Sequence, residues 1–338
     1  MRSIVLYYSH MIFCRPRTPA AKCLHLIRLR EITSRKELIA ETGLSQPTIT
    51  RAVTALAAAG YITERIDLAR ANGRGRPSIP IELAEPKTVY AGIAMGTDET
   101  YIALFDLKGR TVRSVELDLP VAKLDQDDVI QHLMAGLNRL TAGLDRTLAA
   151  VGVTASGTVT DNGCVTAPNL GWDHVDLGGQ MREQFAVPVQ VSSVSAAIVG
   201  SEMQSHPNLD MPSVLALFAD DSIACAVATD EGVVPVEVTR EELTTSGLLD
   251  DVRRHDVTTL AEAVANPAAR DALDRRASGL GQLAGELCEA YHPSTVVVAG
   301  SAFVEDPLFT APFAQAARCL AGNEVELRLL PTHQEMVR

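Results

Sequence analysis

Apolar positions in the first quarter of the chain recur at helical spacing. Between residues 20 and 30 they fall on one stripe, which predicts a helix packed against a small core. Ser34 then offers an N-cap with Glu37 three residues later, the capping-box pattern, so a short second helix is expected. Gly43 breaks this helix and supplies the conformation that a tight turn between two helices requires.

A third helix follows the turn, and its two faces differ in chemistry. Ser45 offers its N-cap, and apolar side chains recur at i, i+4 and i+7 at Ile49, Val53 and Leu56. The opposite face carries small polar and basic side chains, namely Gln46, Thr48, Thr50, Arg51 and Thr54. A helix of this kind directly after a tight turn is typical of the recognition helix of a helix-turn-helix.

A hairpin is expected after the third helix. Gly60 ends the helix, residues 61–66 alternate like a strand, and residues 78–83 can pair back with them. The loop between them is rich in glycine and carries Arg70, Arg74 and Arg76. Three helices followed by a hairpin with an arginine-tipped loop predict a winged helix-turn-helix. Arginines held on glycines suit insertion into a narrow minor groove. The alternative, a protein-docking module followed by a Gly-Arg-Gly-Arg-Pro linker, does not account for those arginines.

The charge of the chain is divided unevenly. Residues 1–90 carry 14 Lys plus Arg against 7 Asp plus Glu, whereas residues 91–338 carry 16 basic and 35 acidic side chains. A basic segment on an acidic chain indicates a polyanion partner for that segment alone, although a solvated basic face is the simpler alternative. With a winged helix-turn-helix the expected partner is duplex DNA. The predicted contact residues are Ser45, Gln46, Thr48, Thr50, Arg51, Arg70, Arg74 and Arg76.

The pattern changes after Pro86 to short β-branched runs that alternate with alanine-rich helical segments. This alternation predicts an α/β architecture with mixed sheets. The expected strands are 89–95, 101–106, 111–116, 149–154, 189–191, 214–218, 225–228 and 295–299. The expected helices are 129–144, 195–204, 260–291 with a break near 266–267, and 312–320.

Composition excludes several classes of protein. With 338 residues, 46% hydrophobic and 21% charged, the chain predicts a soluble globular protein of about two domains. No run reaches the roughly 18 apolar residues that a membrane helix needs. Residues 1–17 are interpreted as a frayed extension rather than a signal peptide. Six scattered cysteines without a Cys-x-x-Cys predict a reduced, cytoplasmic protein with no zinc site and no cofactor.

Three segments of the second region carry a family resemblance. Residues 92–109 (GIAMGTDETYIALFDLKG), 151–177 (VGVTASGTVTDNGCVTAPNLGWDHVDL) and 292–303 (HPSTVVVAGSAF) resemble the first phosphate loop, the sugar-side region and the late strand and turn of the ROK family. This family unites bacterial sugar kinases with sugar-responsive repressors. The resemblance implies an α+β winged helix-turn-helix over residues 18–85 and an α/β, two-lobed, actin-like ATPase (ROK) fold over residues 86–338.

The resemblance also shows where this chain departs from the kinases. Their first loop, Asp-x-Gly-Gly-Thr, serves the metal and the phosphates, and here Ala94 stands at the place of the aspartate and Asp98 at that of the threonine. Their catalytic aspartate lies in Glu-Asn-Asp-Ala-Asn, where this chain has Val194, or Ser193 with a one-residue shift. Neither side chain can act as a general base.

Two further kinase segments are altered. The second phosphate loop, Gly-Thr-Gly-Ile-Gly in the kinases, corresponds to residues 219–223, where Asp220 and Asp221 would repel a triphosphate. We interpret these two acids as a solvated turn rather than a metal site. The family's cysteine-rich zinc segment has no counterpart between residues 234 and 256, which hold one histidine and no cysteine. The chain is therefore not expected to be an enzyme.

These observations predict a DNA-binding transcriptional regulator that acts as a homodimer or higher homo-oligomer, with no membrane partner. A small-molecule effector would bind in the former sugar region, with candidate contacts at Gly157, Asn169, His174, Ser192 and Ser193. A structural role is the alternative for Gly157, as a turn, and for Trp172, as a buried anchor. Two other functions remain open, namely an active sugar kinase with an added DNA-binding domain and a regulator controlled by a protein partner.

Overall fold

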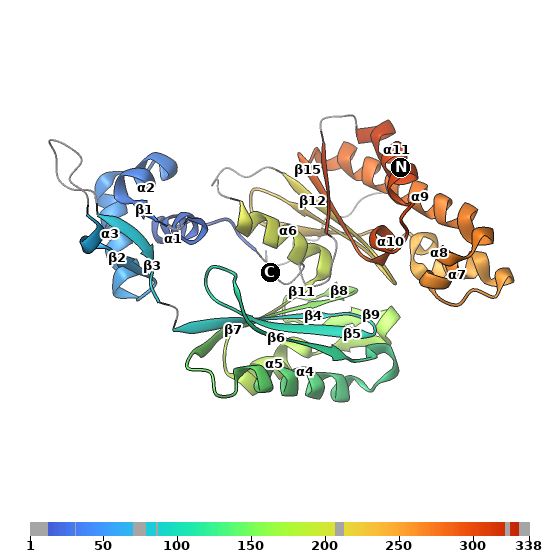
Figure 1. Ribbon diagram of the computed structural model, residues 1–338, viewed down its shortest axis with the longest axis horizontal. Helices are drawn as coiled ribbons and strands as arrows, with labels where there is room; N and C mark the ends of the chain where they lie inside the picture. The colour runs from blue at the N-terminus through green and yellow to red at the C-terminus, as the bar shows by residue number, and fades with distance from the viewer. Residues whose placement is uncertain are drawn as a thin grey trace.

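The structure is a computed structural model, and it describes residues 13–30, 32–69, 79–85, 87–206, 213–321 and 325–330. Figure 1 shows three parts, a small N-terminal unit at one end and two larger lobes, each built on its own sheet. We call the part from α1 to β3 the N-terminal unit, the part from β4 to β11 lobe 1, and the part from β12 to β16 lobe 2.

The N-terminal unit has three helices, α1 (Pro19–Leu29), α2 (Arg35–Thr42) and α3 (Gln46–Ala58). A small sheet of order β1-β3-β2 closes it, formed by β1 (Thr33–Ser34), β2 (Ile62–Glu64) and β3 (Pro80–Leu83). The expected pairing between residues 61–66 and 78–83 is confirmed by the antiparallel register of β2 with β3. One apolar core joins the helices to the sheet.

Two local features of this unit follow from its turn residues. Gly43 has φ 65°, a left-handed conformation that favours glycine, at the turn between α2 and α3. Ser34 caps α2 as expected, because its hydroxyl accepts from the Glu37 amide at 3.3 Å. The Glu37 carboxylate accepts from the hydroxyls of Thr33 and Ser34.

Lobe 1 is built on a five-stranded sheet of order β11-β7-β4-β5-β6. Its strands are β4 (Thr88–Met95), β5 (Glu99–Phe105), β6 (Thr111–Asp118), β7 (Thr147–Ala155) and β11 (Val189–Ser193). Helices α4 (Gln126–Thr141) and α5 (Leu177–Phe185) cover one face (Figure 1). A second sheet of order β10-β9-β8 adds β8 (Thr158–Val159), β9 (Val165–Ala167) and β10 (Trp172–Val175).

Lobe 2 repeats the arrangement of lobe 1, with sheet order β14-β13-β12-β15-β16. In both lobes three parallel strands, β4, β7 and β11 or β12, β15 and β16, continue into two antiparallel ones. The strands are β12 (Val214–Ala219), β13 (Ile223–Ala228), β14 (Val233–Val236), β15 (Thr295–Ala299) and β16 (Glu326–Leu329). Helices α7 (Thr245–Val252), α8 (Leu260–Ala265), α9 (Arg270–Tyr291), α10 (Ser301–Val304) and α11 (Thr310–Ala321) complete it.

Helix α6 (Val194–Ser205) connects the two lobes and packs mainly on β12 and β13 of lobe 2. It follows directly from β11 of lobe 1, and in Figure 1 it lies above the lobe 1 sheet. Its residues are buried from Val194 to Gly200, so one helix contributes to the contact between the lobes over two turns.

The predicted alternation of strands and helices is confirmed, including the break before α9, where Pro267 begins a short 3₁₀ turn. Several elements were not predicted, namely β1, β8 to β10, β14, β16, α5, α7 and α10. The expectation of a frayed extension over residues 1–17 is wrong for its described part. Arg17 donates to the Glu231 carbonyl at 3.3 Å, and the Phe13 ring packs against Gly200 of α6.

Candidate DNA-binding surface and interlobe cleft

Helix α3 presents a polar face to solvent because its apolar side chains enter the core of the N-terminal unit. Ile49, Ala52, Val53 and Leu56 are buried, while Ser45, Gln46, Thr50 and Arg51 are exposed and Thr48 is partly so. Two hydroxyls of this face are already engaged. The Ser45 hydroxyl pairs with that of Thr48 at 2.9 Å, and Thr50 donates to the Gln46 carbonyl at 2.9 Å. The long polar side chains of Gln46 and Arg51 therefore reach outward from the predicted contact set.

The basic residues of the unit fall into paired and outward-facing groups. Arg65, at the foot of the hairpin, donates to Asp67 at 2.8 and 2.6 Å and to Glu82 at 2.8 Å, and these carboxylates raise its pKa. Arg35 pairs with Glu64. Among the residues that the structure describes, Arg51 has no carboxylate within ion-pair distance. Its charge is therefore available to a phosphate or a base edge.

The loop of the predicted wing is the second part of the expected DNA-binding surface. Arg70, Arg74 and Arg76 lie outside the described residues, so their assignment to the minor groove stays a prediction. The strands that flank the loop, β2 and β3, are paired in the register that a wing requires.

The N-terminal unit is attached to α6 through hydrogen bonds at the end of that helix. His25 Nε2 lies 2.9 Å from the His206 carbonyl oxygen, and Arg28 donates to the Gln204 carbonyl. The last carbonyls of a helix lack intrahelical partners and carry partial negative charge, so they favour such groups. Helix α6 thus begins at the junction of the lobes and ends against α1.

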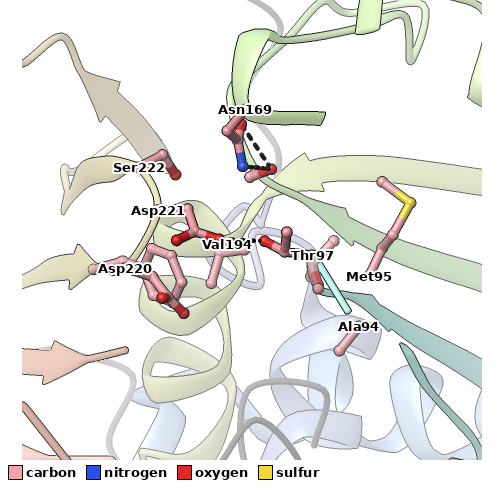
Figure 2. Close-up of a pocket in the computed structure, with 12 residues that line it drawn as sticks. Ala94, Met95, Thr97, Asn169, Val194, Asp220, Asp221 and Ser222 are labelled. Atoms are coloured by element: carbon pink, nitrogen blue, oxygen red, sulfur yellow. Dashed lines mark hydrogen bonds between the residues drawn. The ribbon is translucent and has the colours of Figure 1, made fainter. Parts of the chain in front are cut away.

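Two turns face each other across the cleft between the lobes (Figure 2). One turn follows β4 at residues 96–98, and the other follows β12 at residues 220–222. Thr97 Oγ1 donates to Asp221 Oδ2 at 2.7 Å, so a charge-assisted hydrogen bond joins the lobes. The cavity beside it has a volume of about 40 Å³. Ligand pockets usually measure about 300 to 1,000 Å³, so this cavity has no room for a hexose.

A buried arginine is hydrogen-bonded to the second turn, at residues 220–222. Arg276 of α9 is 4% exposed and donates to the Leu243 carbonyl at 2.8 Å, the Thr245 hydroxyl at 3.2 Å and the Asp220 carbonyl at 3.3 Å. Burial lowers the pKa of Arg276 to about 10, although Asp220 and Asp221 oppose this shift, so the guanidinium is charged at neutral pH. Its charge offsets that of the two acids.

Asp220 and Asp221 lie in a partly exposed turn, as predicted, but both carboxylates are also hydrogen-bonded. Asp220 Oδ1 accepts from the Ser301 hydroxyl at 2.5 Å, while Asp221 binds Thr97. A larger hollow of about 580 Å³ lies between the lobes beside the same turns, and it is lined by Asp98, Glu99 and Glu305 in addition to the two turn acids. A negatively charged phosphate chain would be repelled by this lining.

The structure shows which residue lies in the cleft at the place of the kinases' catalytic aspartate. Val194, the first residue of α6, lines the small cavity, whereas the Ser193 hydroxyl caps α6 by accepting from the Ala196 amide at 3.3 Å. Of these two candidates for the aspartate position, Val194 is the one that faces the cavity (Figure 2).

The five predicted effector residues are not brought together. Asn169 lines the small cavity and donates to Ser156 Oγ at 3.2 Å, while Ser192 lines a separate hollow near α1. His174 is exposed and lines neither cavity, and Ser193 is used as a helix cap. Gly157 has φ 83°, and a Cβ there would lie 2.2 Å from the Thr166 carbonyl, which supports its structural alternative.

Trp172 is 3% exposed and belongs to the core of lobe 1, as its structural alternative predicts. Within the described ranges, no group of three His, Cys, Asp or Glu side chains is arranged to hold a metal ion. The lack of zinc in the protein stays a prediction. Cys23, Cys225 and Cys288 are buried, and burial raises the pKa of their thiols.

Two residues of the cleft were missed by the sequence analysis. Ser301 and Arg276 hold the second turn, and only Arg276 left a readable signal. It falls on the apolar stripe of α9 with Ala272, Ala277 and Leu280, where an arginine has to be paired or hydrogen-bonded.

The three parts define a class of protein, one in which a helix-turn-helix unit with a β-hairpin is joined to a two-lobed domain of actin-like fold. Residues 90–229 match the sequence model of the ROK family. The chain is 29% identical to a transcriptional regulator of Mycobacterium tuberculosis, over 85% of this chain and 75% of that protein. It is 27% identical to the xylose repressor of Bacillus subtilis, over 54% of this chain and 48% of that repressor.

Solved structures share the fold. A ROK family transcriptional regulator, described as a homologue of the MLC protein of E. coli, superposes with a TM-score of 0.74 at 17% identity, over 94% of this chain and 93% of the regulator. A ROK glucokinase from Streptomyces griseus in complex with glucose and AMPPNP gives 0.60 at 15% identity, over 74% of this chain and 96% of the kinase. In the part of the chain that the structure describes, no helix is long and apolar enough to cross a membrane.

Proposed function

We propose that this chain is a DNA-binding transcriptional regulator of the ROK type. The observation that carries the proposal is the outward polar face of α3, where Gln46 and Arg51 extend from a helix whose other face is buried. The names of the relatives support it, as does the likeness to the ROK regulator over 94% of this chain, which includes the N-terminal unit. We also propose that the chain is divided into an extension at 1–17, a DNA-binding domain at 18–85 and a ROK domain at 86–338.

In the proposed complex, Gln46, Thr48 and Arg51 contact base edges in the major groove, while Ser45 and Thr50 border the contact. The arginines at 70, 74 and 76 enter the neighbouring minor groove. One module of this size reads only a few base pairs, so we expect a homodimer that binds two half-sites.

The proposal assigns no phosphoryl transfer to the two-lobed domain. Val194 faces the cavity where a base would be needed, and the turns that would hold phosphates carry Asp98, Asp220 and Asp221. The domain instead pairs the subunits and responds to an effector. Because α6 runs from the cleft to α1, a change in lobe closure would move the N-terminal unit.

The second candidate function is an active sugar kinase with an added DNA-binding domain, which the fold shared with a ROK glucokinase favours. Control by a protein partner without a small ligand is a third candidate. Binding studies on the two-lobed domain with small molecules separate it from the first.

The proposal is tested by mapping the genomic sites that the protein occupies and measuring the affinity of the purified full chain for one enriched fragment. We expect that fragment to bind about 10³-fold more tightly than a scrambled fragment at physiological salt. Equal retention of both fragments at every salt concentration would contradict specific DNA binding.

A further inference from the structure

A cavity of about 430 Å³ lies where α1, α6 and the lobe 1 sheet meet. It is distinct from the small cleft cavity, although Thr154 borders both. Its lining comes from Phe13 and Arg28, from strands β4, β7 and β11, from residues 105–109 at the end of β5, and from α6. The volume falls within the range of small-molecule sites.

The floor of this cavity is a part of the lobe 1 sheet that carries glycines in place of larger side chains. Gly92 of β4 and Gly152 of β7 are register partners, and both line the cavity. Gly152 is exposed although β7 has a strand on either side. A glycine inside a strand weakens it and often marks a place where a ligand approaches closely. A Cβ added at Gly152 would meet only the Ala91 carbonyl oxygen, at 3.8 Å, so the space above it is open.

The walls are largely apolar and carry one uncompensated positive charge. Phe13, Tyr90 and Phe105 supply aromatic surface. Asp106 also lines the cavity, but its carboxylate already accepts from the Lys108 amide and from the amide and guanidinium of Arg110.

Arg28 differs from Asp106 because it is bound only to a neutral group. Its guanidinium donates to the Gln204 carbonyl, and within the described residues no carboxylate lies within ion-pair distance of it. Burial lowers the pKa of Arg28, as expected for a cation taken from water without a counter-charge. A ligand that brings one negative charge would relieve this cost.

We propose that this junction cavity binds a small monocarboxylic acid with an aliphatic or aromatic body. One guanidinium matches one carboxylate, which it can bind through two parallel hydrogen bonds. The aromatic walls and the glycine floor match the apolar body. Ser192, predicted as an effector contact, lines this cavity and not the cleft.

The test measures acid binding to the full-length protein without DNA, so it does not depend on the proposed function. Octanoate and phenylacetate are the probes, with octanol and octylamine as the neutral and cationic controls, in calorimetry and thermal-shift assays. We expect octanoate to bind at least about tenfold more tightly than octanol, because only the acid pairs with Arg28.

Four variants separate the cavity from the docking of α1. Gly152→Leu fills the floor and should abolish binding of both acids, whereas Thr147→Leu, an exposed site on the same strand outside the cavity, should not. Arg28→Gln should remove the preference, so that octanoate and octanol bind with equal affinity. His25→Gln removes a docking hydrogen bond but no cavity charge, so it should keep that preference.

Several results would overturn the proposal. These are no binding of either acid at about 1 mM, equal binding of octanoate and octanol, or unchanged acid binding in Gly152→Leu. If Gly152→Leu instead changes the oligomeric state in sedimentation while the acids have no effect, the glycine floor is a subunit contact and the proposal is wrong.

Discussion

Helix α3 and the interlobe cleft both carry clustered polar residues, but they use them in opposite ways. On α3, the long side chains of Gln46 and Arg51 point into solvent. In the cleft, Thr97 binds Asp221, and Ser301 binds Asp220. A group whose hydrogen bonds are already made has little to gain from a ligand, whereas a solvent-facing group can exchange water for a partner. The polar groups of α3 are therefore available to a ligand, whereas most of those in the cleft already bind other groups of the protein.

The largest expected effect is the absence of sugar kinase activity in the cleft. Purified protein should give no sugar-dependent ADP release with glucose or N-acetylglucosamine, because general-base assistance alone contributes about 10² to 10⁴ in rate and Val194 cannot supply it. Val194→Asp alone should not create activity, since the phosphate-facing turns stay acidic. A coupled ADP assay measures this. Sugar-dependent turnover that Asn169→Ala removes would show that the cleft is a working kinase site.

The next effect concerns the buried support of the cleft. Arg276→Met should destabilise the protein by about 2 to 4 kcal/mol, because it removes the donor to the Leu243 carbonyl and the Thr245 hydroxyl, takes one of two donors from the Asp220 carbonyl, and uncovers the charge of Asp220 and Asp221. Urea unfolding followed by circular dichroism measures this change. The matched control is Arg275→Met on the same helix, which loses an exposed pair with Asp251 and should cost at most about 1 kcal/mol. Equal losses in both variants would refute the role of Arg276.

A smaller effect is expected for the bond that joins the lobes. Thr97→Val keeps the shape of the side chain but removes the donor to Asp221, which should cost about 0.5 to 1.5 kcal/mol and open the cleft. Small-angle scattering and urea unfolding measure these two changes. Thr141→Val is the control, because that hydroxyl donates only to carbonyls of its own helix. If scattering is identical for Thr97→Val and the wild type, the bond does not hold the lobes together.

The smallest effect is a pH dependence at the docking of α1. Burial lowers the pKa of His25 below its ordinary value near 6.5, so the unfolded chain binds a proton more readily than the folded one. Stability should therefore fall as the pH drops below about 6.5 and level off once the folded form is also protonated. His25→Gln should flatten this slope in urea unfolding between about pH 5 and pH 8, and His132→Gln, an exposed site, should not. A slope that survives His25→Gln would assign it to other groups.

Much of the fold could be predicted from periodicity, because buried positions repeat with the spacing of their element. The stripe at Ile49, Val53 and Leu56 defined α3, and Pro267 correctly placed the break before α9. Short elements such as β8 and β16 were missed, because two to four residues are too few to show a period and their pairing depends on distant strands.

The candidate sites were predictable to different degrees. The α3 face follows from one local pattern, so its residues were placed together correctly on one surface. The effector set combined residues from separate elements, and the structure divides Asn169 and Ser192 between two cavities. Contacts between distant segments, such as Thr97 with Asp221 or Arg28 with Gln204, leave no local signal in a single sequence.

The central claim is that the exposed face of α3 reads DNA, and one measurement on the full chain tests it most directly. Fluorescence anisotropy over a range of salt concentrations compares the wild type, Arg51→Ala and Arg139→Ala on an enriched fragment and on a scrambled one. Arg139 is exposed on α4 in lobe 1, so its replacement makes the same change of charge away from the proposed surface. We predict that Arg51→Ala weakens specific binding by about 1 to 3 kcal/mol and relaxes sequence preference, while Arg139→Ala binds as the wild type does. Equal affinities for all three proteins on the enriched fragment would contradict the account.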